Sequence, residues 1–139
     1  MPSQHEPKPP AWWGEALPEP GRPPPELRER WVILWDGDCG FCRRSVMWTL
    51  RHVPAERVTA VPYQQATAWL PPAVLDASPR QAHLRAPDGR YWGGGAVGVP
   101  LLRLAGHPWF AALLARTPLR YPLLWGYRWV TRHRAALGR

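Results

Sequence analysis

The chain has 139 residues, enough for one domain with a single modest core and short for a second catalytic domain. Its formal net charge of +8 favours anionic partners, but Lys8 is the only lysine among 18 basic residues and no reader motif is present, so we expect no dedicated nucleic-acid binding. No signal peptide is recognisable, and charges and prolines interrupt the long apolar stretches. A cytoplasmic protein without a membrane span is therefore expected.

Residues 1–29 are dense in proline and glutamate and show neither helical nor strand periodicity. Because proline cannot donate to a helix or a sheet ladder, this segment is predicted to be a disordered, extended arm. Trp12 and Trp13 are the exceptions, since they could pin the arm onto the domain or onto a partner. The folded domain is expected over residues 30–139.

The domain begins with a short apolar run followed by a helical repeat. Trp31–Trp35 contains β-branched and aromatic residues, which is typical of a strand buried on both faces. After a turn, apolar side chains recur at helical spacing and predict a helix of about three turns, which Pro54 ends. The apolar positions of this helix are Cys42, Val46, Leu50 and Val53.

The remaining elements alternate between strand and helix patterns. A turn at Pro87-Asp88-Gly89 predicts an antiparallel hairpin, and Gly106 is a plausible helix cap. The elements expected in order are a strand at 58–61, a short helix at 67–75, hairpin strands at 82–85 and 91–92, and helices at 97–105, 109–115 and 123–134. Two strands joined by a helix form a parallel pair, to which a hairpin adds two strands. The predicted fold is α/β, a mixed four-stranded sheet with flanking helices and extra C-terminal helices.

The two cysteines, Cys39 and Cys42, lie at the first strand-to-helix junction. In a reducing compartment, a lone close pair of thiols indicates redox activity or metal binding. A helix N-terminus stabilises an anion, so a thiolate there should have a depressed pKa. Cys39 precedes the helix and is expected to be exposed, whereas Cys42 faces the core. This arrangement favours Cys39 as the attacking thiol and Cys42 as the resolving thiol, and such exchange needs no cofactor.

Asp36 and Asp38 flank the turn that precedes the thiols. Asp36 could relay the proton that Cys42 loses when it resolves the intermediate. Alternatively, its carboxylate caps the turn or the helix, and the same holds for Asp38 as an N-terminal cap.

Two other interpretations of the cysteine pair remain open. A zinc site would need two further ligands, and none of the five histidines has paired spacing. Two inert buried thiols are also conceivable, although the neighbouring Asp and Gly residues favour an exposed turn.

The segment WDGDCGFC resembles the signature of the DCC family of thiol-disulfide oxidoreductases, also called the domain of unknown function 393 family. Gly94-Gly95-Ala96-Val97 resembles the family's Gly-x-x-Ala step into a helix, and residues 127–134 resemble its Tyr-x-x-Val-x-x-x-Arg tail. The family's Asp-x-x-Cys-x-x-Cys motif maps to Asp36, Cys39 and Cys42.

The resemblance extends from about Trp31 to Arg134 and implies a thioredoxin-like fold with thiol-disulfide exchange on a protein or small-molecule substrate. Two positions depart from the pattern. Trp35 stands where the family usually has tyrosine. Pro79 is the only proline near the start of the third strand, where thioredoxin-like sites place a cis-proline, and it sits early.

An alternative from a different class is a non-catalytic binding module. The chain has ten tryptophans, most of which suit core packing. The C-terminal helix nevertheless combines Trp125 and Trp129 with several arginines, a composition compatible with a weak membrane-surface contact or with a solvated helix face. In a binding module, this basic, Trp-rich surface would hold the partner.

Overall fold

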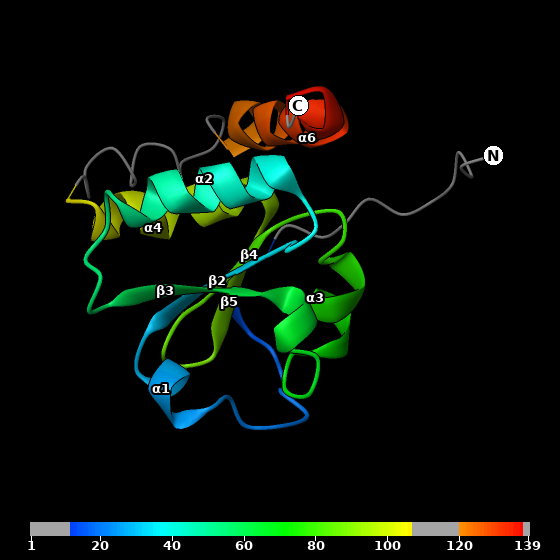
Figure 1. Cartoon of the computed structure of the whole chain (residues 1–139). Helices are drawn as coiled ribbons and strands as arrows, with labels where there is room; N and C mark the ends of the chain where they lie inside the picture. The colour runs from blue at the N-terminus through cyan, green and yellow to red at the C-terminus, as the bar shows by residue number, and fades with distance from the viewer. Residues whose placement is uncertain (1–11, 107–119, 138–139) are drawn as a thin grey trace.

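A five-stranded mixed sheet forms the centre of the protein, whose computed structural model describes residues 12–106 and 120–137 (Figure 1). The strand order is β1-β5-β4-β2-β3. β2 and β3 are parallel, and the other neighbouring pairs are antiparallel. The strands are β1 (Trp13–Ala16), β2 (Trp31–Trp35), β3 (Val58–Pro62), β4 (His83–Arg85) and β5 (Arg90–Gly93).

β2 lies between β3 and β4 and is covered on both faces, as its apolar sequence predicts. Ile33 packs in the cluster that contains Val46 of the following helix. Val32 and Leu34 point to the opposite cluster. This alternation follows from the two-residue repeat of a strand, and it places the carboxyl end of β2 beside the start of the helix.

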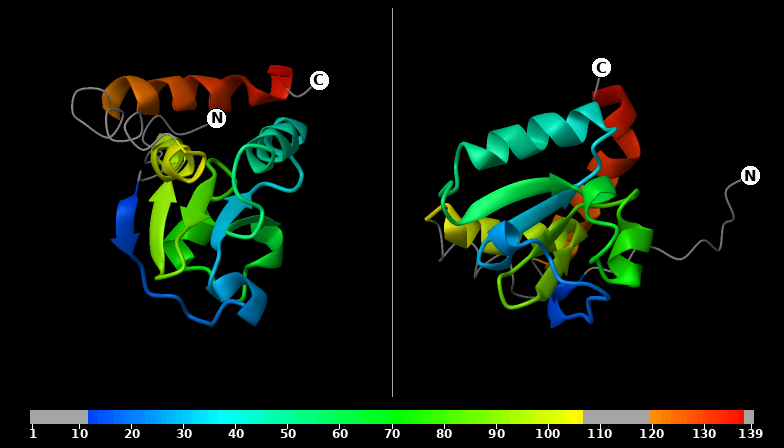
Figure 2. Two further views of the ribbon diagram at one scale, coloured as in Figure 1. Left: turned by 90° about the vertical axis from the view of Figure 1, so that its left-hand side faces the viewer. Right: turned by 60° about the horizontal axis from the view of Figure 1, so that its bottom comes forward.

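Helices cover both faces of the sheet (Figure 2). The 3-10 turn η2 (Gly94–Val97) and the helices α2 (Gly40–Leu50), α4 (Gly98–Leu104) and α6 (Arg120–Leu137) lie on one side. α1 (Pro25–Arg28), the 3-10 turn η1 (Tyr63–Gln65) and α3 (Pro72–Ala77) contribute to the opposite apolar cluster. α6 contacts both η2 and α2 and thereby lies over the beginning of α2.

The β2–α2–β3 unit, the β4–β5 hairpin and the helices after it form the thioredoxin-like α/β fold that the sequence predicts. The predicted sheet of four strands was wrong by one strand. Gly106 ends its helix with a φ of +94°, as expected for a cap. The short helix predicted at 67–75 forms instead at Pro72–Ala77, because proline is well tolerated in the first turn of a helix. The helix predicted at 109–115 lies outside the described residues.

The fifth strand comes from the segment predicted to be a disordered arm, and for residues 12–29 that prediction was wrong. β1 pairs with β5, where Gly14 adopts a φ of +91° beside a register shift. Farther along, Glu19 accepts hydrogen bonds from Arg85 at 2.7 and 2.9 Å and from the Tyr91 hydroxyl at 2.7 Å. Sheet pairing and this ion pair bind the proline-rich segment to the domain.

Candidate functional site

The cysteine pair lies where α2 begins. Cys39 is the N-cap, with extended backbone angles, and its Sγ accepts a hydrogen bond from the Cys42 amide at 3.2 Å. The sulfur thus takes the place that a serine oxygen usually has in a helix cap. The expectation that Asp38 caps the helix was wrong. Both thiols are free and half-buried, so Cys39 is less exposed than predicted.

Asp36 follows β2 directly and shares its two carboxylate oxygens between the turn and the site. Oδ1 accepts hydrogen bonds from the Asp38 amide at 3.0 Å and from Gln64 Nε2 at 2.9 Å. Oδ2 lies 3.8 Å from Nη2 of Arg134. The side chain is only 16% exposed. Asp36 therefore forms the turn, as one interpretation predicted, and also faces the thiols.

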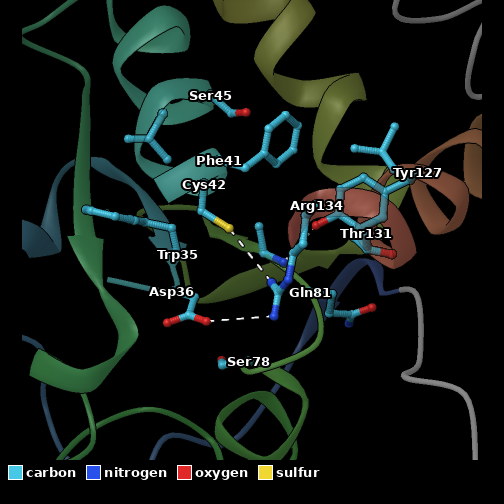
Figure 3. Close-up of a pocket in the computed structure, with 13 residues that line it drawn as sticks. Trp35, Asp36, Phe41, Cys42, Ser45, Ser78, Gln81, Tyr127, Thr131 and Arg134 are labelled. Atoms are coloured by element: carbon cyan, nitrogen blue, oxygen red, sulfur yellow. Dashed lines mark hydrogen bonds and ion pairs between the residues drawn. The ribbon is translucent and has the colours of Figure 1, made fainter. Parts of the chain in front are cut away.

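A cavity of about 130 Å³ opens beside Cys42 (Figure 3). Its walls come from α2, from α6 and from the loop that joins α3 to β4. Most of the lining is apolar, so a sulfur that enters it is partly shielded from water. The lining residues are Trp35, Asp36, Phe41, Cys42, Ser45, Val46, Ser78, Gln81, Ala82, Tyr127, Val130, Thr131 and Arg134.

Of the polar side chains that α6 contributes to this cavity, Tyr127 and Arg134 bond to other segments of the chain. The Tyr127 oxygen accepts a hydrogen bond from the Ala82 amide at 2.8 Å. Arg134 donates through Nη1 to Cys42 Sγ at 3.8 Å and through Nη2 to the Pro79 carbonyl at 2.7 Å. Pro79, the candidate for a substrate-facing proline, thus offers its backbone oxygen to α6.

The surroundings of Cys42 favour its neutral form. Burial raises the pKa of Cys42 to about 12, and the hydrogen bond with Cys39, the charge of Cys39 and the charge of Asp36 act in the same direction. The guanidinium of Arg134 is the influence that lowers it. Cys42 is therefore protonated at neutral pH when both thiols are reduced.

A buried polar chain supports the cavity from the sheet side. The Ser78 hydroxyl donates to the Val74 carbonyl at 2.7 Å and lies 3.4 Å from Nδ1 of His83. The Gln81 amide lies 3.1 Å from Nε2 of His83, an arrangement that suits a donor toward that nitrogen. Burial lowers the pKa of His83 to about 3, so the ring is neutral near pH 7.

The structure brings Asp36, Cys39 and Cys42 together, as the sequence predicts, and adds residues that local patterns did not indicate. Gln64, Ser78 and Gln81 carried no recognisable signal in the sequence. Tyr127 and Arg134 were visible only as positions of the tail motif. No group of three His, Cys, Asp or Glu side chains suited to a metal ion occurs within residues 12–106 and 120–137.

Comparison with known protein families gives a match that covers the site. None of the helices in the described part of the chain has the length and hydrophobicity to cross a membrane. No match was found among curated proteins or among solved structures. Residues 33–139, which include the last three residues of β2, the cysteine pair and α6, match the family described as DCC1-like thiol-disulfide oxidoreductase. The chain therefore belongs to the DCC1-like thiol-disulfide oxidoreductase family.

Proposed function

We propose that the protein catalyses dithiol-disulfide exchange, with Cys39 as the attacking thiol, Cys42 as the resolving thiol and Asp36 as the proton acceptor. The observation that carries this proposal is the pairing of the thiols at the start of α2, where Cys39 Sγ accepts the Cys42 amide hydrogen. A thiolate at Cys39 gains from this amide and from the positive end of the helix dipole.

In the reducing direction, the Cys39 thiolate attacks one sulfur of a substrate disulfide. A mixed disulfide forms, and the other substrate sulfur leaves as a thiolate that takes a proton from water. Cys42 then loses its proton and attacks Cys39 Sγ, which forms the Cys39–Cys42 disulfide and releases the second substrate thiol. The protein loses two electrons and the substrate disulfide gains two, so no cofactor is needed. The reverse sequence oxidises a dithiol substrate.

The order of these steps follows from the charges around Cys42. In the reduced site, the hydrogen bond with Cys39 and its charge help to raise the pKa of Cys42. A mixed disulfide on Cys39 carries no charge, so both influences end at the moment when Cys42 must ionise. Asp36 can then accept the Cys42 proton and pass it to water. Cys42 is thus held neutral until Cys39 has reacted.

The substrate of this exchange is a disulfide or dithiol of a protein or of a small molecule, and the proposed site of action is the cytoplasm. Cys39→Ser should abolish turnover, because it removes the attacking sulfur. Cys42→Ser should still form the mixed disulfide but should accumulate it.

The decisive measurement is the rate of alkylation of the reduced protein against pH, with peptide mapping to separate the two thiols. Faster labelling of Cys39 than of Cys42 near neutral pH supports the proposal. Equally slow labelling of both thiols near neutral pH would contradict it.

A second candidate function rests on the outward surface of α6. Trp125 and Trp129 are large exposed apolar side chains, and the neighbouring Arg128 and Arg132 are exposed too. Such a surface suits an anionic membrane or an acidic partner. Binding to anionic vesicles that persists in Cys39→Ser, in a protein with unreactive thiols, would favour this function over exchange.

A further inference from the structure

Arg134 is the residue of α6 that reaches the thiols, and it contacts three groups that belong to three different segments. These are Sγ of Cys42 on α2 and Oδ2 of Asp36 after β2 (Figure 3), and the Pro79 carbonyl before β4. We propose that Arg134 is a positioning residue of the resolving step, which holds Asp36 beside Cys42 and stabilises the thiolate that Cys42 must form. This inference rests on the proposed exchange.

The anchoring of Arg134 suits this role. Its shortest contact, 2.7 Å, is to the neutral Pro79 carbonyl, whereas both acidic groups lie at 3.8 Å. The guanidinium is thus held by a backbone carbonyl and does not form a close ion pair with a carboxylate that would neutralise its charge. Its planar fork can address sulfur and oxygen at the same time, which a lysine ammonium cannot do with the same geometry.

The placement of α6 explains why the side chain arrives there. Tyr127 lies seven residues before Arg134, about two turns along the same face of the helix. Its oxygen takes the Ala82 amide hydrogen at 2.8 Å, which fixes the helix against the start of β4. Arg128 and Arg132, on other faces of α6, are exposed. Arg134 is therefore directed to the site by the register of the helix.

The charged and titratable groups that face Cys42 come from every neighbouring element. Cys39 belongs to the start of α2, Asp36 to the end of β2, and Tyr127 and Arg134 to α6. Behind Gln81, His83 of β4 is neutral near pH 7. Burial keeps Tyr127 protonated, since its pKa is raised to about 12. Among the described residues, Arg134 is thus the cation in this set and the group that lowers the pKa of Cys42.

The effect on the resolving step can be derived from the charges. After Asp36 has passed the Cys42 proton to water, a carboxylate and a thiolate share one guanidinium. Removal of that cation should raise the pKa of Cys42 by about 1 to 3 units. Each unit lowers the thiolate fraction about tenfold, but the more basic thiolate is about threefold more nucleophilic. The net loss is about threefold per unit, or about 3- to 40-fold in the rate of resolution at pH 7.

The test separates the two sulfur steps in one experiment. The reduced protein is mixed with 5,5′-dithiobis(2-nitrobenzoate) in a stopped-flow spectrometer. Attack by Cys39 releases the first coloured thiolate, and resolution by Cys42 releases the second. The variants are Arg134→Gln, Arg134→Lys and, as the matched control, Arg132→Gln, which removes the same charge from an exposed position of the same helix. Circular dichroism checks that each variant is folded.

Arg134→Gln should slow only the second release, by about 3- to 40-fold relative to Arg132→Gln, and the deficit should shrink as the pH rises. Arg134→Lys should recover part of the rate. An unchanged second release, or equal slowing of both releases, would overturn the positioning role. If the wild-type protein released only the first thiolate, exchange itself would be contradicted and the role of Arg134 would fall with it.

Discussion

Two arginine-carboxylate pairs of this protein differ in geometry and burial. Arg85 and Glu19 meet through two hydrogen bonds of 2.7 and 2.9 Å, with side chains only 6% and 16% exposed. Arg134 and Asp36 meet through one contact of 3.8 Å, and the arginine is 27% exposed. In the first pair, Glu19 also accepts a hydrogen bond from the Tyr91 hydroxyl, and Cζ of Arg85 lies over the Trp69 ring, 5.9 Å from its centre. The second pair is shared with a thiol and a carbonyl.

This difference determines whether each pair contributes to stability or to proton transfer. A close, buried pair joined by two hydrogen bonds resists any change of protonation and binds one segment of chain to another. A long pair in a half-open cavity contributes little to stability but leaves its carboxylate able to take and release a proton. The same residue types therefore serve the fold in one place and the proposed chemistry in the other.

The largest expected effect concerns the close pair. Glu19→Gln should lower the free energy of unfolding by about 3 kcal/mol, because Arg85 would keep a buried charge without its counterion. Urea denaturation monitored by fluorescence measures this loss. The rates of both sulfur steps should remain within about twofold at temperatures where the variant is folded.

A matched control for this variant is Asp88→Asn, which breaks the exposed pair with Arg90 at 2.8 Å. Its expected cost is below about 1 kcal/mol. Equal losses in the two variants would show that burial does not distinguish the pairs.

Breaking the Arg134–Asp36 pair should change the rate of the resolving step and leave the stability nearly unchanged. Asp36→Asn retains the oxygen that accepts the Asp38 amide hydrogen but removes the proton acceptor. The resolving step should slow by about 100-fold, whereas the free energy of unfolding should change by less than about 1 kcal/mol. Stopped-flow kinetics and urea denaturation of the same sample measure both quantities. A large stability loss with normal kinetics would assign Asp36 to the turn alone.

The pH dependence of stability tests the buried polar chain of Ser78, Gln81 and His83 behind the cavity. The pKa of His83 in the folded protein is about 3, below its unfolded value of about 6.5, so the unfolded chain binds the extra proton. The contribution of neutral His83 to the free energy of unfolding is complete above about pH 6.5 and is lost as the pH falls towards 3. Over this range, the free energy of unfolding should change with pH by a slope that approaches about 1.4 kcal/mol per pH unit.

Urea titrations between pH 7 and 4 measure this slope. His83→Gln should flatten it, whereas His52→Gln, at an exposed position beyond the end of α2, should leave it as in the wild type. An identical slope in all three proteins would contradict the account of His83.

The smallest expected effect comes from Gln64→Ala, which tests whether Oδ1 of Asp36 serves the turn while Oδ2 serves the site. Gln64→Ala removes the hydrogen bond to Oδ1 and the bond that the Gln64 side-chain oxygen accepts from the Gly37 amide at 3.1 Å. Stability should fall by about 1 kcal/mol. The resolving rate should fall only a few-fold, because Oδ2 keeps its place beside Arg134. A rate loss as large as that of Asp36→Asn would show that Gln64 orients the proton acceptor.

The strand, turn and helix that carry the thiols were predictable because each has a strong local signal. Trp31–Trp35 is continuously apolar, the next apolar side chains repeat with helical spacing, and the Pro-Asp-Gly turn indicates its hairpin. Parallel pairing of β2 with β3 then follows from the helix between them. The meeting of Asp36, Cys39 and Cys42 needed only this local information.

The contributions of the N-terminal segment and of α6 could not be predicted in this way. β1 has four residues and no repeat, and it forms because β5 offers a free edge. Its attachment depends on Glu19, whose partner Arg85 is 66 residues away. Likewise, the pattern of α6 indicates a solvated basic face, which is correct for Arg128 and Arg132. In the sequence, the tail motif alone separates Arg134 from them, and its contacts with the site follow from the packing of the whole helix.

The contact between Arg134 and Cys42 spans 92 residues of chain. Closing so long a loop costs more entropy than forming the hairpin or the β2–α2–β3 unit, so we expect α6 to dock late in folding. The two sulfurs would then stand at their helix before the guanidinium reaches them. Newly folding chains would pass through a stage in which Cys39 and Cys42 are in place but Arg134 does not yet contact them. At that stage, oxidants could react with the two thiols without the ordered steps proposed for the folded protein.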